Sequence, residues 1–296
     1  MRIDHPVRPG LRTECADGGR LMLVQGGRPV LFARQRASQY GVHYARTGAY
    51  RSPLAPGRAD TARAVAAFAS AGSDAWMERW AARAAAELRG AAEGPLHEGD
   101  WNLGVTTPGW FVDRNWAKLL AHDPDRGHLT WFGYGDPEED ARDLLPLRAL
   151  SAPDAARVKA YRRQYREGVL PPVLLWWVSG LNSPVVLDGH DRLVAALAEG
   201  GRPEILMLSR RVDAAYAAMC SARPVEEYAS RTAALEDDDP LAGVKAAVAS
   251  RRLADTLRAI ERAPEITRAW PVAGGVAAWE RSAAAHVPGW GPAPMP

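Results

Sequence analysis

Apolar and polar positions follow two different periods along this chain, and its first region contains both. Residues 20–36 hold two β-prone runs on either side of a Gly-Gly pair, which predicts a hairpin. Apolar positions recur at helical spacing over 59–71 and 74–90, so we expect two helices there. Residues 101–135 are rich in Trp, Gly and Thr, which favours short strands joined by turns.

Two details of this region have both a structural and a functional interpretation. Trp76 and Trp80 lie four residues apart and share a helical face, so core packing is the expected role and a ligand-stacking platform is the alternative. The run His-Asp-Pro-Asp at 122–125 contains metal-ligating residue types. Because Asp-Pro-Asp is ordinary turn chemistry, we expect a surface turn there.

Strands and helices alternate in the middle third of the chain. A short strand leads to Ser151, which we expect to cap a helix, with Asp154 at the third helical position in a capping-box arrangement. The helix is expected to run to Glu167 and to stop at Gly168, because glycine commonly follows the last helical residue.

The next elements are expected to be two strands, a helix and a third strand. The run PPVLLWWV at 171–178 predicts a strand, SGLNS a turn, and PVVLD at 184–188 the second strand. An apolar helical pattern begins around Asp191 and is closed by glycine, and EILMLSR at 204–210 predicts the last strand.

The last third of the chain is predicted to be helical. Residues 213–232 and 241–263 have helical patterns, and the acidic run at 236–239 is expected to solvate a linker and to favour the start of the second helix. From about Ser282 the chain is rich in Ala, Gly and Pro, which predicts a frayed tail.

These elements predict an α/β fold, α+β overall, in four regions. We expect an α+β N-terminal region at 1–137, which is a candidate substrate or specificity domain, and a mixed-sheet core at 138–212. A helical region at 213–281 and a flexible tail at 282–296 follow, and the acidic run at 136–143 suggests the first boundary.

Composition narrows the classes of function. The chain has 296 residues, 47% of them hydrophobic, which is enough for one large domain or two modest ones. Its formal net charge is +2, which lacks the strong positive excess typical of nucleic-acid-binding proteins. The two cysteines, Cys15 and Cys220, form neither a disulfide framework nor a zinc pattern. With no signal-peptide-like run and no long apolar run, we expect a soluble cytoplasmic protein with no membrane partner.

The stretch VVLDGHDRLVAAL at 185–197 carries the candidate chemistry. Gly189 permits a positive φ or the close approach of a ligand, and the first N–H groups of the following helix form an anion site. Arg192 adds a planar charged fork suited to phosphate, and His190 can donate to a phosphate or move a proton near neutral pH. Asp188 can hold a divalent cation or accept a hydroxyl proton. In the alternative interpretation, Asp188 or Asp191 only caps the helix, Arg192 pairs with an aspartate, and His190 lies in a surface turn.

The order of elements around this turn resembles the ParB/sulfiredoxin superfamily. The residues that carry the resemblance are LLPLRALS at 144–151, the helix and strand at 157–178, and above all the Asp-Gly-His-Asp-Arg turn. Sulfiredoxins place a catalytic cysteine in this turn, where this chain has Gly189 and His190, so sulfinic-acid reduction is not expected. Partition ParB proteins have Gly-Glu-Arg-Arg there, followed by a helix-turn-helix domain, and this chain shows neither.

The Asp-Gly-His-x-Arg form is similar to the free-serine kinase branch and to ParB-like nuclease domains. The resemblance implies an enzyme that binds ATP or ADP with Mg²⁺ and moves a phosphoryl group to a small hydroxyl substrate, or hydrolyses the nucleotide. Asp188 and His190 are then the catalytic candidates, with Asp188 also a candidate metal ligand. Those kinases also use an acidic residue just after the first strand, and this chain has only Ser151 or Asp154 near that place. Candidate contacts to nucleotide and phosphate are Gly189, Asp191, Arg192 and, from the end of the next strand, Arg210, with Arg211 beside it.

Two other functions are compatible with the same turn. One is a nucleotide-responsive, DNA-associated regulator, for which the basic stripe RVKAYRRQYR at 157–166 argues weakly, since these cations can simply form a solvated helix face. The other is a metal-dependent nuclease, for which one Asp and one His supply one metal site and no second acidic pair is near in sequence.

Overall fold

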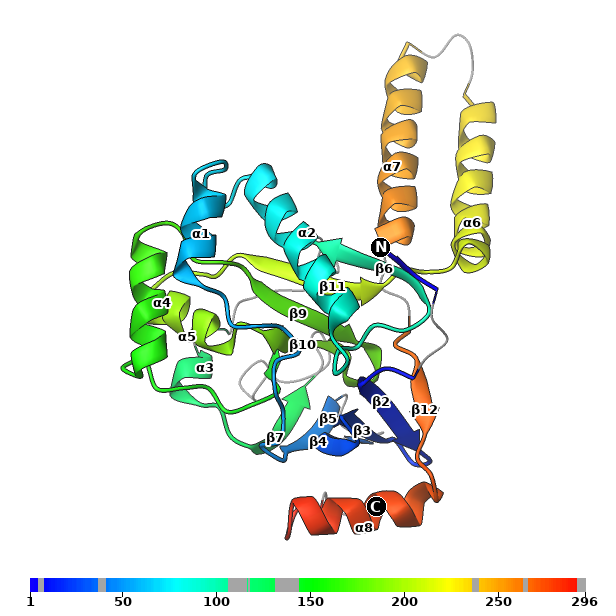
Figure 1. Cartoon of the computed structure of the whole chain (residues 1–296). Helices are drawn as coiled ribbons and strands as arrows, with labels where there is room; N and C mark the ends of the chain where they lie inside the picture. The colour runs from blue at the N-terminus through cyan, green and yellow to red at the C-terminus, as the bar shows by residue number, and fades with distance from the viewer. Residues whose placement is uncertain are drawn as a thin grey trace.

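The computed structural model describes residues 1–4, 8–36, 41–105, 116, 118–130, 144–235, 240–262 and 266–291. Within this part the chain forms two six-stranded sheets and eight α-helices, which confirms the predicted mixed class, α+β overall (Figure 1). Three predicted features lie wholly or largely outside the described residues: the linker at 236–239, the boundary at 136–143 and part of the strand-rich segment at 101–135.

The sheet that carries the 188–192 turn is mixed. Strands β10 and β11 flank β9, with β10 antiparallel and β11 parallel to it, and β6 pairs antiparallel with β11. Across the sheet the strands are β1 (Arg2–Ile3), β6 (Gly99–Gly104), β11 (Ile205–Arg210), β9 (Val173–Val178), β10 (Ser183–Asp188) and β8 (Leu145–Pro146). The predicted strands of the middle third are therefore confirmed, and this sheet also takes two strands from the N-terminal region.

Strand β9 is buried on both faces, which explains its unbroken apolar sequence VLLWWV. Leu174, Trp176 and Val178 join the core between the two sheets. The alternate residues, among them Leu175 and Trp177, join a second core on the side of helices α3 (Lys118–Ala121) and α5 (His190–Ala198). Because side chains alternate across a strand, this central strand fixes the two layers between which the turn is held.

The second sheet is antiparallel except for β12 (Ala269–Pro271), which pairs parallel with β2 (Leu11–Ala16). Its strands, in order across the sheet, are β12, β2, β3 (Arg20–Gln25), β4 (Arg28–Arg36), β5 (Gly41–Arg46) and β7 (Arg126–Thr130). The predicted hairpin is β3–β4, closed by Gly26 and Gly27, which both have positive φ. Its inner face, with Leu23 and Leu31, packs into the core that it shares with β9.

Four helices surround the sheet with the turn. Helices α4 (Ala156–Arg166) and α5 pack against each other, and α1 (Ala59–Ala66) and α2 (Asp74–Gly90) cover the opposite side (Figure 1). Trp76 and Trp80 of α2 are both buried in the main core, with ring centroids 5.7 Å apart, which confirms the predicted core role.

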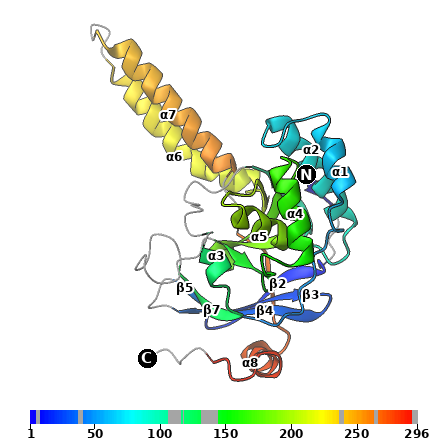
Figure 2. The same cartoon turned by 90° about the vertical axis from the view of Figure 1, so that its left-hand side faces the viewer.

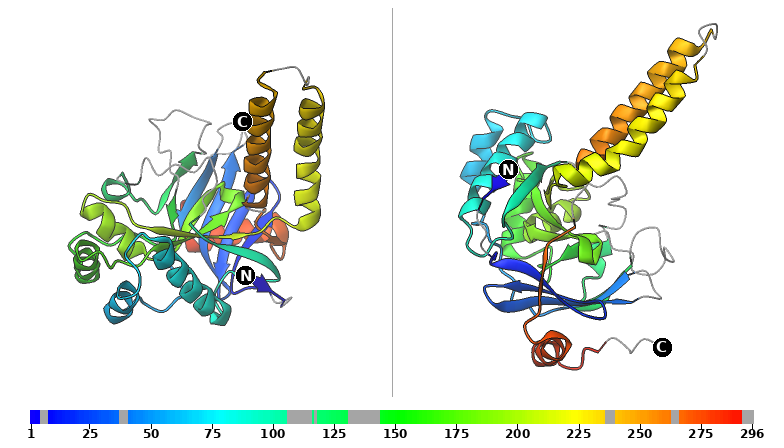
Figure 3. Two further views of the ribbon diagram at one scale, coloured as in Figure 1. Left: turned by 90° about the horizontal axis from the view of Figure 1, so that it is seen from above. Right: turned by 90° about the vertical axis from the view of Figure 1, so that its right-hand side faces the viewer.

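Helices α6 (Ala214–Ala233) and α7 (Ala242–Arg262) form a hairpin that projects away from the rest of the molecule (Figures 2 and 3). No residue of α6 is buried. Among the described residues no helix is both long enough and apolar enough to cross a lipid bilayer.

The C-terminal segment returns to the antiparallel sheet. Strand β12 pairs with β2, and helix α8 (Gly275–His286) lies across the outer face of that sheet (Figure 2). The prediction of a frayed tail from Ser282 is wrong for this stretch, because the helix continues to His286 and both Ala283 and Val287 are buried. Trp279 supplies the reason, since its ring packs edge-on against Phe32 of β4 at a centroid distance of 5.5 Å.

We predict that Trp279→Ala lowers the free energy of unfolding by about 3–5 kcal/mol, because it removes a fully buried aromatic side chain from the contact between α8 and the sheet. The matched control is Ile266→Ala, whose side chain is 78% exposed and whose change is expected to stay within about 0.5 kcal/mol. Denaturant unfolding monitored by circular dichroism measures both. Equal midpoints for the two variants would contradict the packing of α8.

Candidate functional site

The turn at 188–192 joins a buried strand directly to a buried helix. Strand β10 ends at Asp188, Gly189 takes a left-handed conformation with φ +93°, and α5 begins at His190, one residue before the predicted start. A Cβ atom on Gly189 would lie 2.8–3.0 Å from the guanidinium of Arg192. Glycine is therefore required here both for its backbone angle and because Arg192 folds over it.

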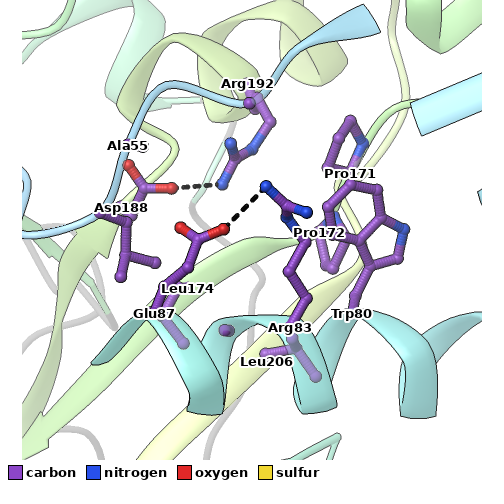
Figure 4. Close-up of a pocket in the computed structure, with 13 residues that line it drawn as sticks. Ala55, Trp80, Arg83, Glu87, Pro171, Pro172, Leu174, Asp188, Arg192 and Leu206 are labelled. Carbon is purple, nitrogen blue, oxygen red and sulfur yellow. Dashed lines mark hydrogen bonds and ion pairs between the residues drawn. The ribbon is translucent and has the colours of Figure 1, made fainter. Parts of the chain in front are cut away.

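Asp188 binds two partners from different parts of the chain. Its Oδ2 accepts a hydrogen bond from Arg192 Nη2 at 2.7 Å, and its Oδ1 accepts one from Ser52 Oγ at 2.6 Å. Figure 4 shows the carboxylate facing the Arg192 guanidinium. Nearby, Tyr50 donates its hydroxyl to the carbonyl of Leu187, and burial, followed by the charge of Asp188, holds the pKa of that hydroxyl well above its ordinary value. The segment that contains Tyr50 and Ser52 is thus attached to the end of β10.

Asp191 binds the segment that contains Arg148 and Ser151, which forms the other wall of the site. It is buried, and its Oδ1 accepts hydrogen bonds from Ser151 Oγ at 2.7 Å and from Arg148 Nη2 at 2.9 Å. Arg157 approaches the other carboxylate oxygen at 3.9 Å. The prediction that Ser151 caps the next helix is wrong: α4 begins at Ala156, because the intervening residues form a turn and Ser151 donates to Asp191 instead.

A buried arginine, Arg46, binds the backbone of the segment that carries Arg148. The guanidinium of Arg46, at the end of β5, contacts both carboxylate oxygens of Asp123 at 3.0 Å and donates to the carbonyls of Pro146 and Arg148. Asp123 also accepts from the backbone N–H of Leu150. The predicted surface turn at 122–125 is therefore only half exposed, and its first aspartate connects the antiparallel sheet to the segment that carries Arg148.

His190 is enclosed at the start of α5. Its side chain is 2% exposed, and its Nε2 has no hydrogen-bond partner among the residues that the structure describes. Burial, followed by the positive charges of Arg148, Arg46 and Arg192, holds the pKa of His190 well below its ordinary value. The ring is therefore neutral near pH 7, and it can donate or accept a hydrogen bond but does not act as a cation.

These residues line a cleft of about 460 Å³ at the N-terminus of α5. Among the described residues, four arginines line it, at positions 51, 148, 157 and 192, against two aspartates, which leaves an excess of two positive charges. His190 Nε2 and Arg192 Nε are buried and have no partner in the described part of the chain. Arg192 Nε–H is a donor, and His190 Nε2 donates or accepts according to which ring nitrogen carries the proton. With its positive charges, the cleft is suited to an anion with several acceptor oxygens.

A second, smaller cavity of about 40 Å³ adjoins the cleft and shares Asp188 and Arg192 with it. Its other wall is α2, where Arg83 and Glu87 form an ion pair at 2.9 Å beside Trp80 (Figure 4). The Asp188–Arg192 pair therefore forms the partition between the two spaces.

Arg210 does not belong to this site. Strand β10 runs antiparallel to β9 while β11 runs parallel to it, so the C-terminal ends of β10 and β11 lie at opposite ends of the sheet. Arg210 instead lies beside Gly99 of β6 and close enough to His97 to lower the pKa of that ring, although burial is the larger cause. The prediction that Arg210, with Arg211, contacts phosphate at the turn is corrected by this topology.

The basic stripe of α4 is largely neutralised by neighbouring acids. Arg162 and Arg166 both bind Glu199 at the end of α5, and Arg163 binds Glu167. Arg157 is the cation of the stripe that lines the cleft among the described residues, next to Tyr161.

Mg²⁺, which the resemblance implies, is bound through carboxylates, and of the two that line the cleft Asp188 is the one predicted as its ligand. Asp188 is the carboxylate at the partition, and Mg²⁺ that accompanies a nucleotide commonly uses one or two carboxylates together with phosphate oxygens. Across the described ranges, no group of three or more His, Cys, Asp or Glu side chains is arranged to hold a metal ion. The residues present therefore fit an ion that arrives with a phosphate ligand.

Sequence reasoning brought together Asp188, Gly189, His190 and Asp191 with Arg192, and the structure places all five around the cleft. Tyr50, Arg51 and Ser52 were not predicted to belong to the site. Tyr50 and Ser52 lie 137 and 136 residues from their partners at the turn, and no local pattern indicates such a contact. Arg148 lay inside the quoted segment LLPLRALS, but nothing in the pattern showed that its side chain points to Asp191.

We predict that Gly189→Ala disrupts the site, since the added methyl group displaces Arg192 from Asp188 in addition to straining the backbone. The matched control is Gly200→Ala, which has a similar φ of +74° with nothing within 4 Å of the added atom. The control is expected to lose about 1 kcal/mol of stability, and Gly189→Ala about 1–3 kcal/mol more. Chemical denaturation compares them, and equal losses would show that Arg192 does not pack over Gly189.

We predict that Asp123→Asn destabilises the protein by about 3 kcal/mol, because it removes the negative charge whose two oxygens contact Nη1 of the buried Arg46 guanidinium. Asp125→Asn is the control from the same turn. Asp125 also approaches Arg46 at 3.0 Å, but its side chain is 69% exposed, so its loss is expected to cost less than about 1 kcal/mol. Thermal unfolding of both variants measures the difference, and the reverse order would contradict this assignment.

Three comparisons, with protein-family models, with curated proteins and with solved structures, found no match to this chain. The resemblance of residues 144–210 to the ParB/sulfiredoxin superfamily therefore stays a prediction from the residues of the turn and the order of the elements around it.

Proposed function

We propose that the chain binds a nucleotide, ATP or ADP with Mg²⁺, in the cleft at the N-terminus of α5 and transfers a phosphoryl group to a hydroxyl or to water. The observation that carries the proposal is the excess of two positive charges among the described residues that line the cleft, at the N-terminus of α5. A phosphate group matches this arrangement in charge and in the number of acceptor oxygens.

The arginines have distinct roles in this proposal. Arg192 lines the cleft as a permanent positive charge, and Asp188 fixes its guanidinium through Nη2. Arg148 is oriented by Asp191, and Arg51 and Arg157 lie nearer to solvent at the edge of the cleft. The first backbone N–H groups of α5 add the positive end of the helix dipole. Such preorganised donors stabilise the charge that spreads over a transferring phosphoryl group.

Asp188 and His190 supply the remaining chemistry. Asp188 accepts the proton of the attacking hydroxyl, since a hydroxyl already donates to its Oδ1. His190, neutral at pH 7, donates a hydrogen bond to a phosphoryl oxygen. Asp188 is the side chain that would hold Mg²⁺, and the ion would supply positive charge to offset that of the phosphate oxygens.

The two alternative functions receive less support from the described residues. The arginines at 162, 163 and 166 are paired with glutamates, which weakens the case for a DNA-associated regulator that uses the stripe on α4. A nuclease would use the same Asp188 and His190, so the binding experiment includes an oligonucleotide. We further propose a cytoplasmic location, which is consistent with two free cysteines.

The test is calorimetric titration of the purified protein with ATP, ADP and CTP in the presence of Mg²⁺. We predict that the protein binds one of these nucleotides and that Arg157→Ala weakens binding about tenfold, equivalent to about 1.4 kcal/mol. Arg163→Ala, on the same helix but outside the cleft, is the matched control and is expected to bind like the wild type. Absence of binding by the wild type, or binding of a single-stranded oligonucleotide in preference to every nucleotide, would overturn the proposal.

A further inference from the structure

The hydroxyl of Ser52 lies against Asp188, the carboxylate that the proposed function uses as proton acceptor. Its Oγ donates to Asp188 Oδ1 at 2.6 Å, while the other oxygen of the same carboxylate binds Arg192. Ser52 lies on the exposed side of the cleft, in the segment between β5 and α1. Its Oγ also accepts a hydrogen bond from the N–H of Leu54 at 3.2 Å, which leaves one lone pair for attack.

The backbone around Ser52 is held in place from both sides. The buried side chain of Gln25 donates to the carbonyl of Arg51 at 2.7 Å and accepts from its N–H at 2.9 Å. Tyr50 is fully buried and donates to the carbonyl of Leu187, next to Asp188. Two buried side chains thus position the loop that presents Ser52, and such positioning is a large part of what an intramolecular reaction needs.

From this geometry we propose that the protein phosphorylates itself on Ser52. The inference rests on the proposed function, because the phosphoryl donor is a nucleoside triphosphate bound in the cleft. A bond forms between Ser52 Oγ and the γ-phosphorus of ATP, and the bond from that phosphorus to the β-γ bridging oxygen breaks. The hydroxyl proton passes to the carboxylate of Asp188, and ADP leaves with the bridging oxygen.

The charge of the cleft matches the product of this step. A phosphoserine carries about −1.5 to −2 charge at neutral pH, which balances the excess of two positive charges that line the cleft. Arg51 follows directly from Tyr50 and precedes Ser52, so one of the arginines is adjacent to the acceptor in the chain. The modified side chain therefore stays in the cleft with its charge compensated.

A second serine in the cleft provides an internal comparison. Ser151 also donates to a carboxylate, Asp191, at 2.7 Å. Each carboxylate also binds an arginine, but Arg148 shares one oxygen of Asp191 with Ser151. Arg192, in contrast, binds the oxygen of Asp188 that Ser52 does not use. Ser52 is also exposed. Ser52 is thus the hydroxyl that both contacts a carboxylate and is open to an incoming ligand.

The experiment incubates the purified full-length chain with radiolabelled ATP and Mg²⁺ and locates the phosphate by peptide mass spectrometry. We expect phosphate on Ser52. The first-order rate constant of labelling should not depend on protein concentration, because the acceptor hydroxyl and the carboxylate belong to one chain. Ser52→Ala should abolish labelling, Ser52→Thr should retain it on the substituted hydroxyl, and Asp188→Asn should slow it by about 10²-fold or more. Ser70→Ala, an exposed serine outside the cleft, should be labelled like the wild type.

The outcomes separate this inference from the proposed function. If calorimetry shows that the wild type binds ATP but no phosphate appears on Ser52, self-phosphorylation is overturned and the nucleotide site stands. Phosphate on Ser151 or outside the cleft, or a first-order rate constant that rises with protein concentration, also overturns it. If the wild type binds no nucleotide, both proposals fall together. Label on the threonine hydroxyl of the Ser52→Thr variant, with none in Ser52→Ala, supports both.

Discussion

The ion pair between Asp188 and Arg192 is the contact on which the rest of the site depends. It closes the turn between β10 and α5, it holds the guanidinium over Gly189, and it leaves one carboxylate oxygen for Ser52. A buried ion pair of this kind adds little net stability, because desolvation offsets its attraction, yet removing one partner costs about 3–5 kcal/mol. Its value here lies in orientation: one carboxylate sets the positions of a cation and of a hydroxyl.

A second layer of ion pairs lies behind the Asp188–Arg192 pair. Asp191 orients Arg148, and Asp123 holds the buried Arg46 behind it. These positive charges, together with burial, keep His190 neutral, so that the centre of the cleft carries a hydrogen-bonding ring instead of a further cation. The aspartates thus act mainly to position arginines, and the charge that remains among the described lining residues is positive.

Much of the fold followed from local pattern. The hairpin at β3–β4, the helix α2, the run from α4 to β11 and the helices α6 and α7 were all predicted, because each has a clear apolar period and glycine or capping signals at its ends. The errors lay where a distant partner decided the outcome. Ser151 donates to Asp191 instead of capping α4, Trp279 holds α8 in place past Ser282, and Arg210 lies at the opposite end of the sheet from the turn.

The sequence by itself determined the turn: a buried strand, a glycine with positive φ, and an amphipathic helix whose first residues are His, Asp and Arg. These are local properties, set by period, backbone freedom and residue type. Only the tertiary structure decided which groups face that turn. Sheet pairing and a shared core bring Tyr50, Ser52 and Arg148 to it from segments far away in the chain. Contacts of this kind depend on strand direction and on packing across layers, which no short stretch of residues encodes.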